Sequence, residues 1–249
     1  MSKEITGALF KQMILHGAAA ITAQKQAIND LNVFPVPDGD TGTNMSMTIA
    51  TAAEALRKAA PASVGQASSV TASALLQGAR GNSGVILSLL FRGIAKSLKD
   101  RETIDGRDLA IALAFGVAAA YKAVMKPAEG TILTVSRLAA AQAAAAAREE
   151  NAAESVLEAA IREGHVALDD TINQNPVLKK AGVVDAGGKG FLVILQGMLD
   201  SLRGEPMPQV EEESAPADKA DFVAMAAEDI TFAFDTVFIV RKHTEEVDL

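Results

Sequence analysis

The chain has 249 residues, which is enough for one large domain or for one domain with an appendage, and we favour the second arrangement. It has no cysteine, which excludes disulfides, thiolate metal sites and cysteine nucleophiles. The net charge of −8 is concentrated in residues 205–249, with 12 acidic and 3 basic residues, whereas residues 1–204 hold 19 acidic and 20 basic residues. A nearly neutral body without a basic stripe argues against binding to nucleic acid.

Apolar residues make up 49% of the chain but aromatic residues only 4%, and much of the apolar content is alanine. This composition favours closely packed helices over a sheet. No segment approaches the roughly 20 apolar residues of a transmembrane helix, and no basic leader precedes an apolar run at the N-terminus. We therefore expect a soluble, unexported, cytoplasmic protein, and the sequence leaves a homo-oligomer open.

Apolar residues recur at spacings of three and four in eight segments, which predicts eight helices. These segments are 4–29, 43–60, 66–78, 84–99, 107–125, 131–148, 152–173 and 188–203. Short connections favour antiparallel neighbours. We therefore predict an all-α fold, an antiparallel eight-helix barrel or bundle with a binding site at one end.

The composition changes after the last predicted helix. We assign the helical domain to residues 1–204, an acidic linker to 205–227 and a tail to 228–249. Within the tail, the alternation over 230–234 and the apolar run over 237–240 are typical of β-strands. One or two strands cannot form a core alone, so the tail either packs on the helical body or opens a further domain that this chain does not complete.

Glycine-rich polar loops precede every second predicted helix. They are residues 38–44 (DGDTGTN), 78–84 (GARGNSG), 129–131 (EGT) and 185–190 (DAGGKG). In an up-and-down bundle these helices run in the same direction, so their starts meet at one end. Helix starts present unpaired backbone N–H groups and the positive end of the helix dipole, and glycine lets a ligand approach closely. Any one loop is better explained by ordinary capping, but four together predict an anion-binding basin.

Asp38 and Asp40 would repel each other in such a basin unless a cation lay between them and the bound phosphates. Mg²⁺ is suitable, because it prefers oxygen ligands and is commonly held by one or two carboxylates with phosphate oxygens. Calcium fits less well, since the further spaced ligands and the closing glutamate of a twelve-residue loop are missing. Arg80 and Lys189 are the cations best placed to stabilise phosphoryl charge, and the alternative is that both are exposed loop residues.

Other catalytic classes lack their motifs. The sequence contains neither a Gly-x-x-x-x-Gly-Lys-Ser/Thr phosphate loop nor a dinucleotide fingerprint on a strand–helix unit. The histidines are His16, His165 and His243, and none lies beside a serine elbow, so a Ser-His-Asp hydrolase is disfavoured.

Residues 31–45, 78–88, 127–135 and 182–190 together resemble the N-terminal kinase domain of bacterial fatty acid kinase, in the same order and over about residues 5–203. More distantly, the chain is similar to the nucleotide-binding subunit of dihydroxyacetone kinase. The resemblance implies an eight-helix barrel that holds ATP or ADP and two Mg²⁺ ions at one end. It also implies phosphorylation of a fatty acid presented by a separate fatty-acid-binding protein, which gives an acyl phosphate.

The resemblance implies roles for individual residues. Asp38 and Asp40 would hold metal and act in catalysis. Arg80 is added as a catalytic candidate because its positive charge could stabilise the phosphoryl group. The phosphates would be lined by Thr41, Gly42, Thr43 and Asn44, with Asn82 and Ser83 in a second phosphate turn. Adenine would lie against Thr131 and Ile132, and ribose against Asp185 and Gly187.

The chain departs from the related patterns at two points. Dihydroxyacetone kinases have a third metal-binding aspartate where this chain has Val33, which cannot ligate a metal, so Asn32 or Asp30 is the candidate replacement. Residues 232–236 weakly resemble the start of the next domain of fatty acid kinases, but Asp235 stands where that family has a cysteine. We therefore expect either a truncated chain or a natural short form.

The expected chemistry follows from the acceptor. A fatty acid carboxylate is already an anionic nucleophile at neutral pH, so no general base is required, and positioning and charge neutralisation would carry the reaction. The alternatives are a dihydroxyacetone kinase-type subunit acting on an alcohol, or a nucleotide-binding regulatory module without turnover.

Overall fold

Helices that alternate in direction make up most of the computed structural model, which describes residues 4–209. The predicted tail, its strand segments and most of the predicted linker lie outside the described residues. The elements in chain order are β1 (Ile5–Thr6), α1 (Gly7–Ala23), α2 (Lys25–Asn29), α3 (Thr41–Lys58), α4 (Val64–Gln77), α5 (Gly81–Ser97), β2 (Thr103–Ile104), α6 (Gly106–Ala123), α7 (Ile132–Glu149), α8 (Ala153–Gln174), α9 (Pro176–Ala181) and α10 (Ala186–Arg203).

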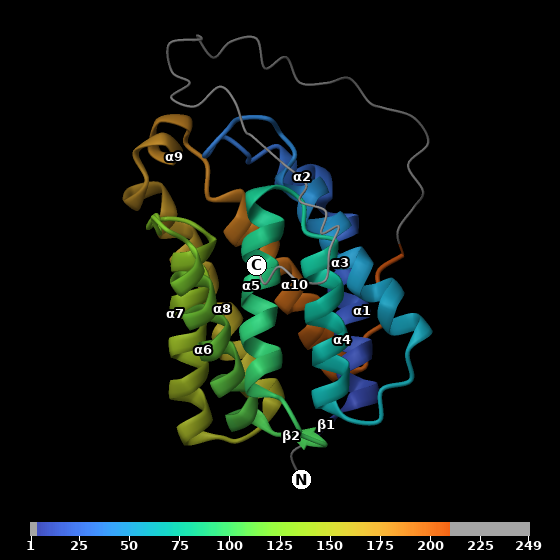
Figure 1. Cartoon of the computed structure of the whole chain (residues 1–249). Helices are drawn as coiled ribbons and strands as arrows, with labels where there is room; N and C mark the ends of the chain where they lie inside the picture. The colour runs from blue at the N-terminus through green and yellow to red at the C-terminus, as the bar shows by residue number, and fades with distance from the viewer. Residues whose placement is uncertain (1–3, 210–249) are drawn as a thin grey trace, which may run out of the picture. The chain divides into compact units, whose positions relative to one another are not determined.

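The eight long helices form a closed ring (Figure 1). In the order α1, α3, α4, α5, α6, α7, α8 and α10, each helix packs against the next, and α10 packs back against α1. The short helices α2 and α9 lie at one end of the ring, and β1 pairs antiparallel with β2 at the other end. This architecture confirms the predicted all-α antiparallel barrel. None of the described helices is long and apolar enough to cross a membrane.

Helix backbones in the ring approach each other closely at glycine. A Cβ added to Gly93 in α5 would lie 2.3 Å from the carbonyl oxygen of Phe115 in α6. One added to Gly116 in α6 would lie 2.7 Å from the carbonyl oxygen of Leu90 in α5. From Ala139 onwards, the buried residues of α7 are all alanine. Small residues therefore set the spacing between neighbouring helices, in agreement with the low aromatic content of the chain.

The N-terminal region differs from the single helix predicted over 4–29. Ile5–Thr6 pairs with Thr103–Ile104 as a short strand, and Thr6 then caps α1 by accepting a hydrogen bond from the backbone N–H of Leu9 at 3.2 Å. The helix is interrupted at Gln24, whose φ of −111° and ψ of 9° are not helical, and α2 then packs against α3. The apolar spacing continues across the interruption, which is why the sequence predicted one helix.

The other long helices begin and end within three residues of the prediction, and two differences bear on the site. Helix α3 begins at Thr41, two residues earlier than predicted, because the carbonyl oxygen of Asp40 already accepts a helical hydrogen bond from Asn44 at 2.8 Å. The connection predicted between residues 173 and 188 contains α9. Asn175 caps this short helix, and it ends at Gly182 with a left-handed φ of 70°.

Gly93→Ala tests the close packing of α5 on α6. Helix propensity alone would make alanine about 1 kcal/mol more favourable than glycine. Because the added Cβ would meet backbone atoms of α6, we instead expect a loss of about 1–3 kcal/mol in the free energy of unfolding, measured by urea denaturation.

Gly164→Ala in α8 is the matched control. Its Cβ would lie 2.4 Å from Cδ2 of Leu192, which is the flexible end of a side chain and can move aside. We expect this variant to stay close to the wild type. Equal stability of the two variants would contradict the proposed backbone contact.

Candidate functional site

The turn at residues 38–40 brings two carboxyl groups together. Gly39 has a φ of 66°, a left-handed conformation that residues with a Cβ rarely adopt. Burial, together with the hydrogen-bonded carboxyl of Asp40, raises the pKa of Asp38. Asp40 occupies the N-cap position of α3, but its side chain does not cap that helix. Two like charges held this close would be stabilised by a cation between them.

The donor set suits Mg²⁺ better than a metal with a full protein shell. Among the described residues, no three His, Cys, Asp or Glu side chains gather into a metal site. The protein therefore offers the carboxylates of Asp38 and Asp40, and Mg²⁺ commonly completes such a shell with water and phosphate oxygens.

Asn32, the candidate third ligand, holds the turn in place. It is 3% exposed, and its amide nitrogen donates to the carbonyl oxygen of Val36 at 2.6 Å and to Oδ1 of Asp38 at 3.0 Å. Its amide oxygen accepts a hydrogen bond from the hydroxyl of Thr41. A carbonyl oxygen can only accept, so the nitrogen must face Val36. This geometry gives Asn32 a positioning role at Asp38, and its expected metal role stays a prediction.

The start of α3 rests on α2. Asn29 donates from Nδ2 to Oγ1 of Thr43 at 3.0 Å, and its Oδ1 accepts from the backbone N–H of Thr43 at 3.0 Å. A Cβ on Gly42 would lie 2.1 Å from the carbonyl oxygen of Lys25, so only glycine allows this approach. Thr43 and Gly42 therefore fix the first loop on its neighbouring helix.

The second glycine-rich loop is attached to α3. The hydroxyl of Thr48 accepts a hydrogen bond from the backbone N–H of Arg80 at 3.1 Å and donates to the carbonyl oxygen of Asn44 at 2.7 Å. Gly81 has a φ of 57°, and a Cβ there would lie 2.5 Å from Nδ2 of Asn44. A Cβ on Gly84 would lie 2.4 Å from the Thr48 hydroxyl. These contacts place the starts of α3 and α5 side by side.

The third and fourth loops both rest on the end of α8. The hydroxyl of Thr171 accepts from the backbone N–H of Asp185 at 3.1 Å and donates to the carbonyl oxygen of Leu168 at 2.6 Å. Gly130 has a φ of 72°, and a Cβ there would lie 3.1 Å from the carbonyl oxygen of Thr171 and 2.9 Å from Cβ of Gln174. The starts of α7 and α10 are thereby brought together.

Asp185 links these two helix starts. Its Oδ2 accepts a hydrogen bond from the backbone N–H of Gly188 at 2.7 Å, and its carboxyl also accepts from the backbone of Ile132. Burial raises the pKa of Asp185 to about 6, although both hydrogen bonds oppose this shift. Asp185 is 5% exposed, so its carboxyl acts as a buried cap for α10.

The four helix starts differ in their capping. Helices α3 and α5 begin at Asp40 and Arg80 without a side-chain cap, whereas α7 and α10 are capped by Thr131 and Asp185. First turns without an N-cap side chain leave backbone N–H groups for an anion, although in α3 the N–H of Thr43 already donates to Asn29. The α3–α5 side of the site therefore suits phosphate, and the α7–α10 side suits a less charged group.

A hollow of about 400 Å³ is bounded by residues from all the loop regions. Six predicted nucleotide contacts line it: Asn82, Ser83, Thr131, Ile132, Asp185 and Gly187. Its apolar wall includes Val85, Ile86 and Leu89 of α5 and Leu133 of α7. A volume of this size with apolar walls and a few polar groups is typical of a small-molecule site.

The other predicted site residues do not line this hollow. Asp38 and Asp40 lie in the adjoining first loop, and the exposed Arg80 comes two residues before Asn82. Thr41, Gly42, Thr43 and Asn44 form the first turn of α3 beside it, and Thr43 bonds to Asn29. Their contact with phosphate stays a prediction. Lys189 lines a separate hollow of about 200 Å³ with His165 and Asp200, so the expectation that it stabilises phosphoryl charge is not supported.

The sequence missed several residues of the hollow. Lys126, Val124 and Ala128 come from the segment between α6 and α7, and Phe34 comes from the first loop. All of them lie outside the glycine-rich motifs, and no spacing pattern points to them. The buried polar anchors described above, such as Thr48 and Thr171, lie inside helices and were missed for the same reason.

Comparison with known proteins places the chain in a family, since residues 35–200 match the DAK2 domain. The chain belongs to the DAK2 domain family. It is 44% identical over 246 residues to protein YloV of Bacillus subtilis, with 96% of this chain and 44% of that protein aligned. It is 43% identical to an uncharacterized protein of Staphylococcus saprophyticus, with 97% of this chain and 45% of that protein aligned. This DAK2 chain thus spans less than half the length of these relatives.

The DAK2 fold is also seen in a solved kinase. The dihydroxyacetone kinase from C. freundii, in complex with AMP-PNP and Mg²⁺, matches with a TM-score of 0.60 at 18% sequence identity. The match covers 81% of this chain and 35% of that chain. At this identity the likeness establishes the shared fold.

Asp185→Asn tests the burial of this carboxyl. A raised carboxyl pKa means that its contribution to stability is full below about pH 4 and is lost as the pH rises through about 6. Asparagine can still cap α10. We therefore expect the variant to gain about 1–3 kcal/mol over the wild type at pH 7.5 without ligand, a gain that shrinks as the pH falls towards 4.

Asp105→Asn at the cap of α6 is the control, with the opposite sign. Burial disfavours the charge of Asp105, but hydrogen bonds from Asp108 and Asn151 outweigh it and lower the pKa. This variant should lose stability at pH 7.5, and the loss should disappear at low pH. Chemical denaturation from about pH 2 to pH 8 measures both, because the loss in Asp105→Asn disappears only below about pH 4. Destabilisation of Asp185→Asn at pH 7.5 would contradict the proposed burial of a charged carboxyl.

Proposed function

We propose that this DAK2 chain binds an adenine nucleotide with Mg²⁺ and transfers its terminal phosphoryl group. The observation that carries the proposal is one hollow lined by the starts of α5, α7 and α10 and by Phe34 and Pro35 of the segment before α3, with the carboxyls of Asp38 and Asp40 beside the uncapped start of α3. The phosphates would bind the first turns of α3 and α5, including Asn82 and Ser83. The nucleoside would enter the hollow towards Thr131, Ile132, Asp185 and Gly187.

The proposed metal site consists of Asp38 and Asp40, with Asn32 fixing the first of them. The number of ions, two, is carried from the resemblance to fatty acid kinases. Bound Mg²⁺ would neutralise charge on the phosphates. Arg80, exposed at the start of α5, is proposed to stabilise the charge on the transferred phosphoryl group.

The proposed acceptor is the carboxylate of a fatty acid held by a separate fatty-acid-binding protein. A carboxylate oxygen attacks the terminal phosphorus, the bond to the bridging oxygen breaks, and ADP leaves with the electron pair, which gives an acyl phosphate. No proton has to be removed. The site fits a reaction without a general base. Of the histidines in the described residues, His16 is buried in α1 and His165 lines the other hollow.

A second candidate is a dihydroxyacetone kinase-type subunit that acts on an alcohol, favoured by the fold shared with the C. freundii enzyme. An alcohol gains more from a general base, which would then have to come from a partner subunit. The third reading is a regulatory module that binds nucleotide without turnover. The fatty acid kinase and the alcohol kinase differ in the acceptor that they phosphorylate. The regulatory module differs from both because it does not turn nucleotide over.

Asp38→Asn and Asp40→Asn test the proposed metal site. The wild type is incubated with ATP, Mg²⁺, oleate and a loaded fatty-acid-binding protein, and acyl phosphate is measured. We expect either variant to reduce turnover about a hundredfold or more, because the phosphates lose their metal, while the helical circular dichroism stays unchanged.

The control is Asp108→Asn, which removes a carboxylate paired with Arg101 at 3.3 Å near the start of α6, at the other end of the ring. It should keep full activity. Full activity in Asp38→Asn or Asp40→Asn would refute the metal assignment. Tight ATP binding by the wild type without acyl phosphate would refute the fatty acid kinase function, and phosphorylation of dihydroxyacetone would support the alcohol alternative.

A further inference from the structure

The segment over residues 124–131 forms one wall of the hollow but is poorly held by apolar packing. It contributes Val124, Lys126, Ala128 and Thr131 to the lining. Most of its residues between α6 and Gly130 are exposed, and Met125 is 98% exposed. A segment with so little burial needs other interactions to hold one conformation.

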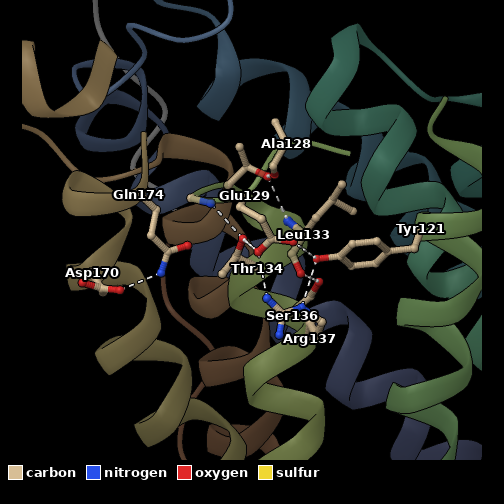
Figure 2. A network of polar contacts seen from close by, with 11 residues as sticks. Tyr121, Ala128, Glu129, Leu133, Thr134, Ser136, Arg137, Asp170 and Gln174 are labelled. Carbon is tan, nitrogen blue, oxygen red and sulfur yellow. Dashed lines mark hydrogen bonds and ion pairs between the residues drawn. The ribbon is translucent and has the colours of Figure 1, made fainter. Parts of the chain in front are cut away.

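A polar network ties this segment to both neighbouring helices (Figure 2). Glu129 accepts a hydrogen bond on Oε1 from the hydroxyl of Tyr121 at 3.1 Å, and its Oε2 pairs with Nη2 of Arg137 at 2.7 Å. Nε of Arg137 donates to the hydroxyl oxygen of Tyr121 at 3.1 Å, which closes a triangle. Tyr121 belongs to the last turn of α6 and Arg137 to α7, so Glu129 bridges the two helices.

The network also reaches the backbone next to the hollow. The hydroxyl of Thr134 donates to Oε2 of Glu129 at 2.7 Å and accepts from the backbone N–H of Gly130 at 2.8 Å. The hydroxyl of Thr131 donates to the carbonyl oxygen of Ala128 at 2.7 Å. The Glu129 carboxylate therefore helps to fix the residues on either side of it. Two of these, Ala128 and Thr131, line the hollow.

We propose that Tyr121, Glu129 and Arg137 form a latch that holds residues 124–131 in the conformation that binds nucleotide. The inference rests on the proposed nucleotide function of the hollow, and it makes these three side chains positioning residues without contact to the ligand.

Because the latch is exposed to water, we expect it to stabilise the conformation of residues 124–131 and to add little to the stability of the whole domain. The side chains of Arg137 and Glu129 are 45% and 51% exposed, and ion pairs this open to water contribute little to global stability. Burial disfavours the charge of Glu129, but hydrogen bonds from Thr134, Arg137 and Tyr121 outweigh it and lower the pKa. The carboxylate is therefore ionised, and the latch closed, across the neutral range.

Glu129→Gln tests the latch by calorimetric titration with ADP and Mg²⁺ and by steady-state kinetics. We expect the Kd for nucleotide and the KM for ATP to rise about three- to tenfold, with kcat within about twofold of the wild type, because ordering the wall now opposes binding. Charge alone predicts the opposite sign, since removing a carboxylate near a polyanion would tighten binding. Tyr121→Phe, which keeps the ring, should shift Kd in the same direction.

The matched control is Glu154→Gln, which breaks the pair between Glu154 and Nε of Arg203 at 2.8 Å, with side-chain exposures of 52% and 33%. It should leave Kd unchanged. In the ligand-free protein, amide hydrogen exchange should speed up over 124–131 in Glu129→Gln and not in Glu154→Gln.

The outcomes distinguish a failure of the latch from a failure of the proposed nucleotide function. Unchanged or tighter nucleotide binding in Glu129→Gln, with a wild type that binds nucleotide, would overturn the latch alone. An equal rise in Kd for Glu154→Gln would also overturn it, because the effect would then be general. A wild type that binds no nucleotide would overturn both.

Discussion

The site depends on the alternation of helix directions in a closed ring. Every second helix of such a ring begins at the same end. The first turns of α3, α5, α7 and α10 therefore lie at one end of the ring because of the topology alone (Figure 1). Buried polar side chains of the ring hold these loops by accepting hydrogen bonds from some of their backbone N–H groups. Asn29, Thr48 and Thr171 each tie one loop to a neighbouring helix, and the glycines allow the close approach that these short bonds require. Fold and site are thus parts of the same arrangement.

The four helix starts differ in capping, and the proposed ligand groups follow this difference. Asp185 and Thr131 satisfy first-turn amides of α10 and α7, and on this side of the hollow we propose the nucleoside. Asp40 and Arg80 do not cap their helices, and at these two starts we propose the phosphates. Asp38 and Asp40 add negative charge on that same side, and burial together with their proximity makes a free pair unfavourable. A divalent cation between carboxylates and phosphates removes both conflicts.

Much of this could be predicted from the sequence, because its signals are local. Apolar spacing identified the long helices, and the glycine-rich strings identified the loops before α3, α5, α7 and α10. Spacing does not say which helix lies opposite a given side chain. The facing of Lys189 into a separate hollow, the use of Asn32 as an internal hydrogen-bonding group and the contact of Tyr121 with Glu129 depend on tertiary packing. The interruption at Gln24 was hidden because the apolar pattern runs through it.

A crystal structure of the chain with ADP and Mn²⁺ would locate both the nucleotide and the metal, because Mn²⁺ in place of Mg²⁺ gives an anomalous signal. We predict ADP in the hollow lined by the starts of α5, α7 and α10, its base towards Thr131 and Ile132, and an anomalous peak between its phosphates and the carboxylates of Asp38 and Asp40. Nucleotide bound in the other hollow, beside His165 and Lys189, or a metal away from both aspartates, would contradict this prediction.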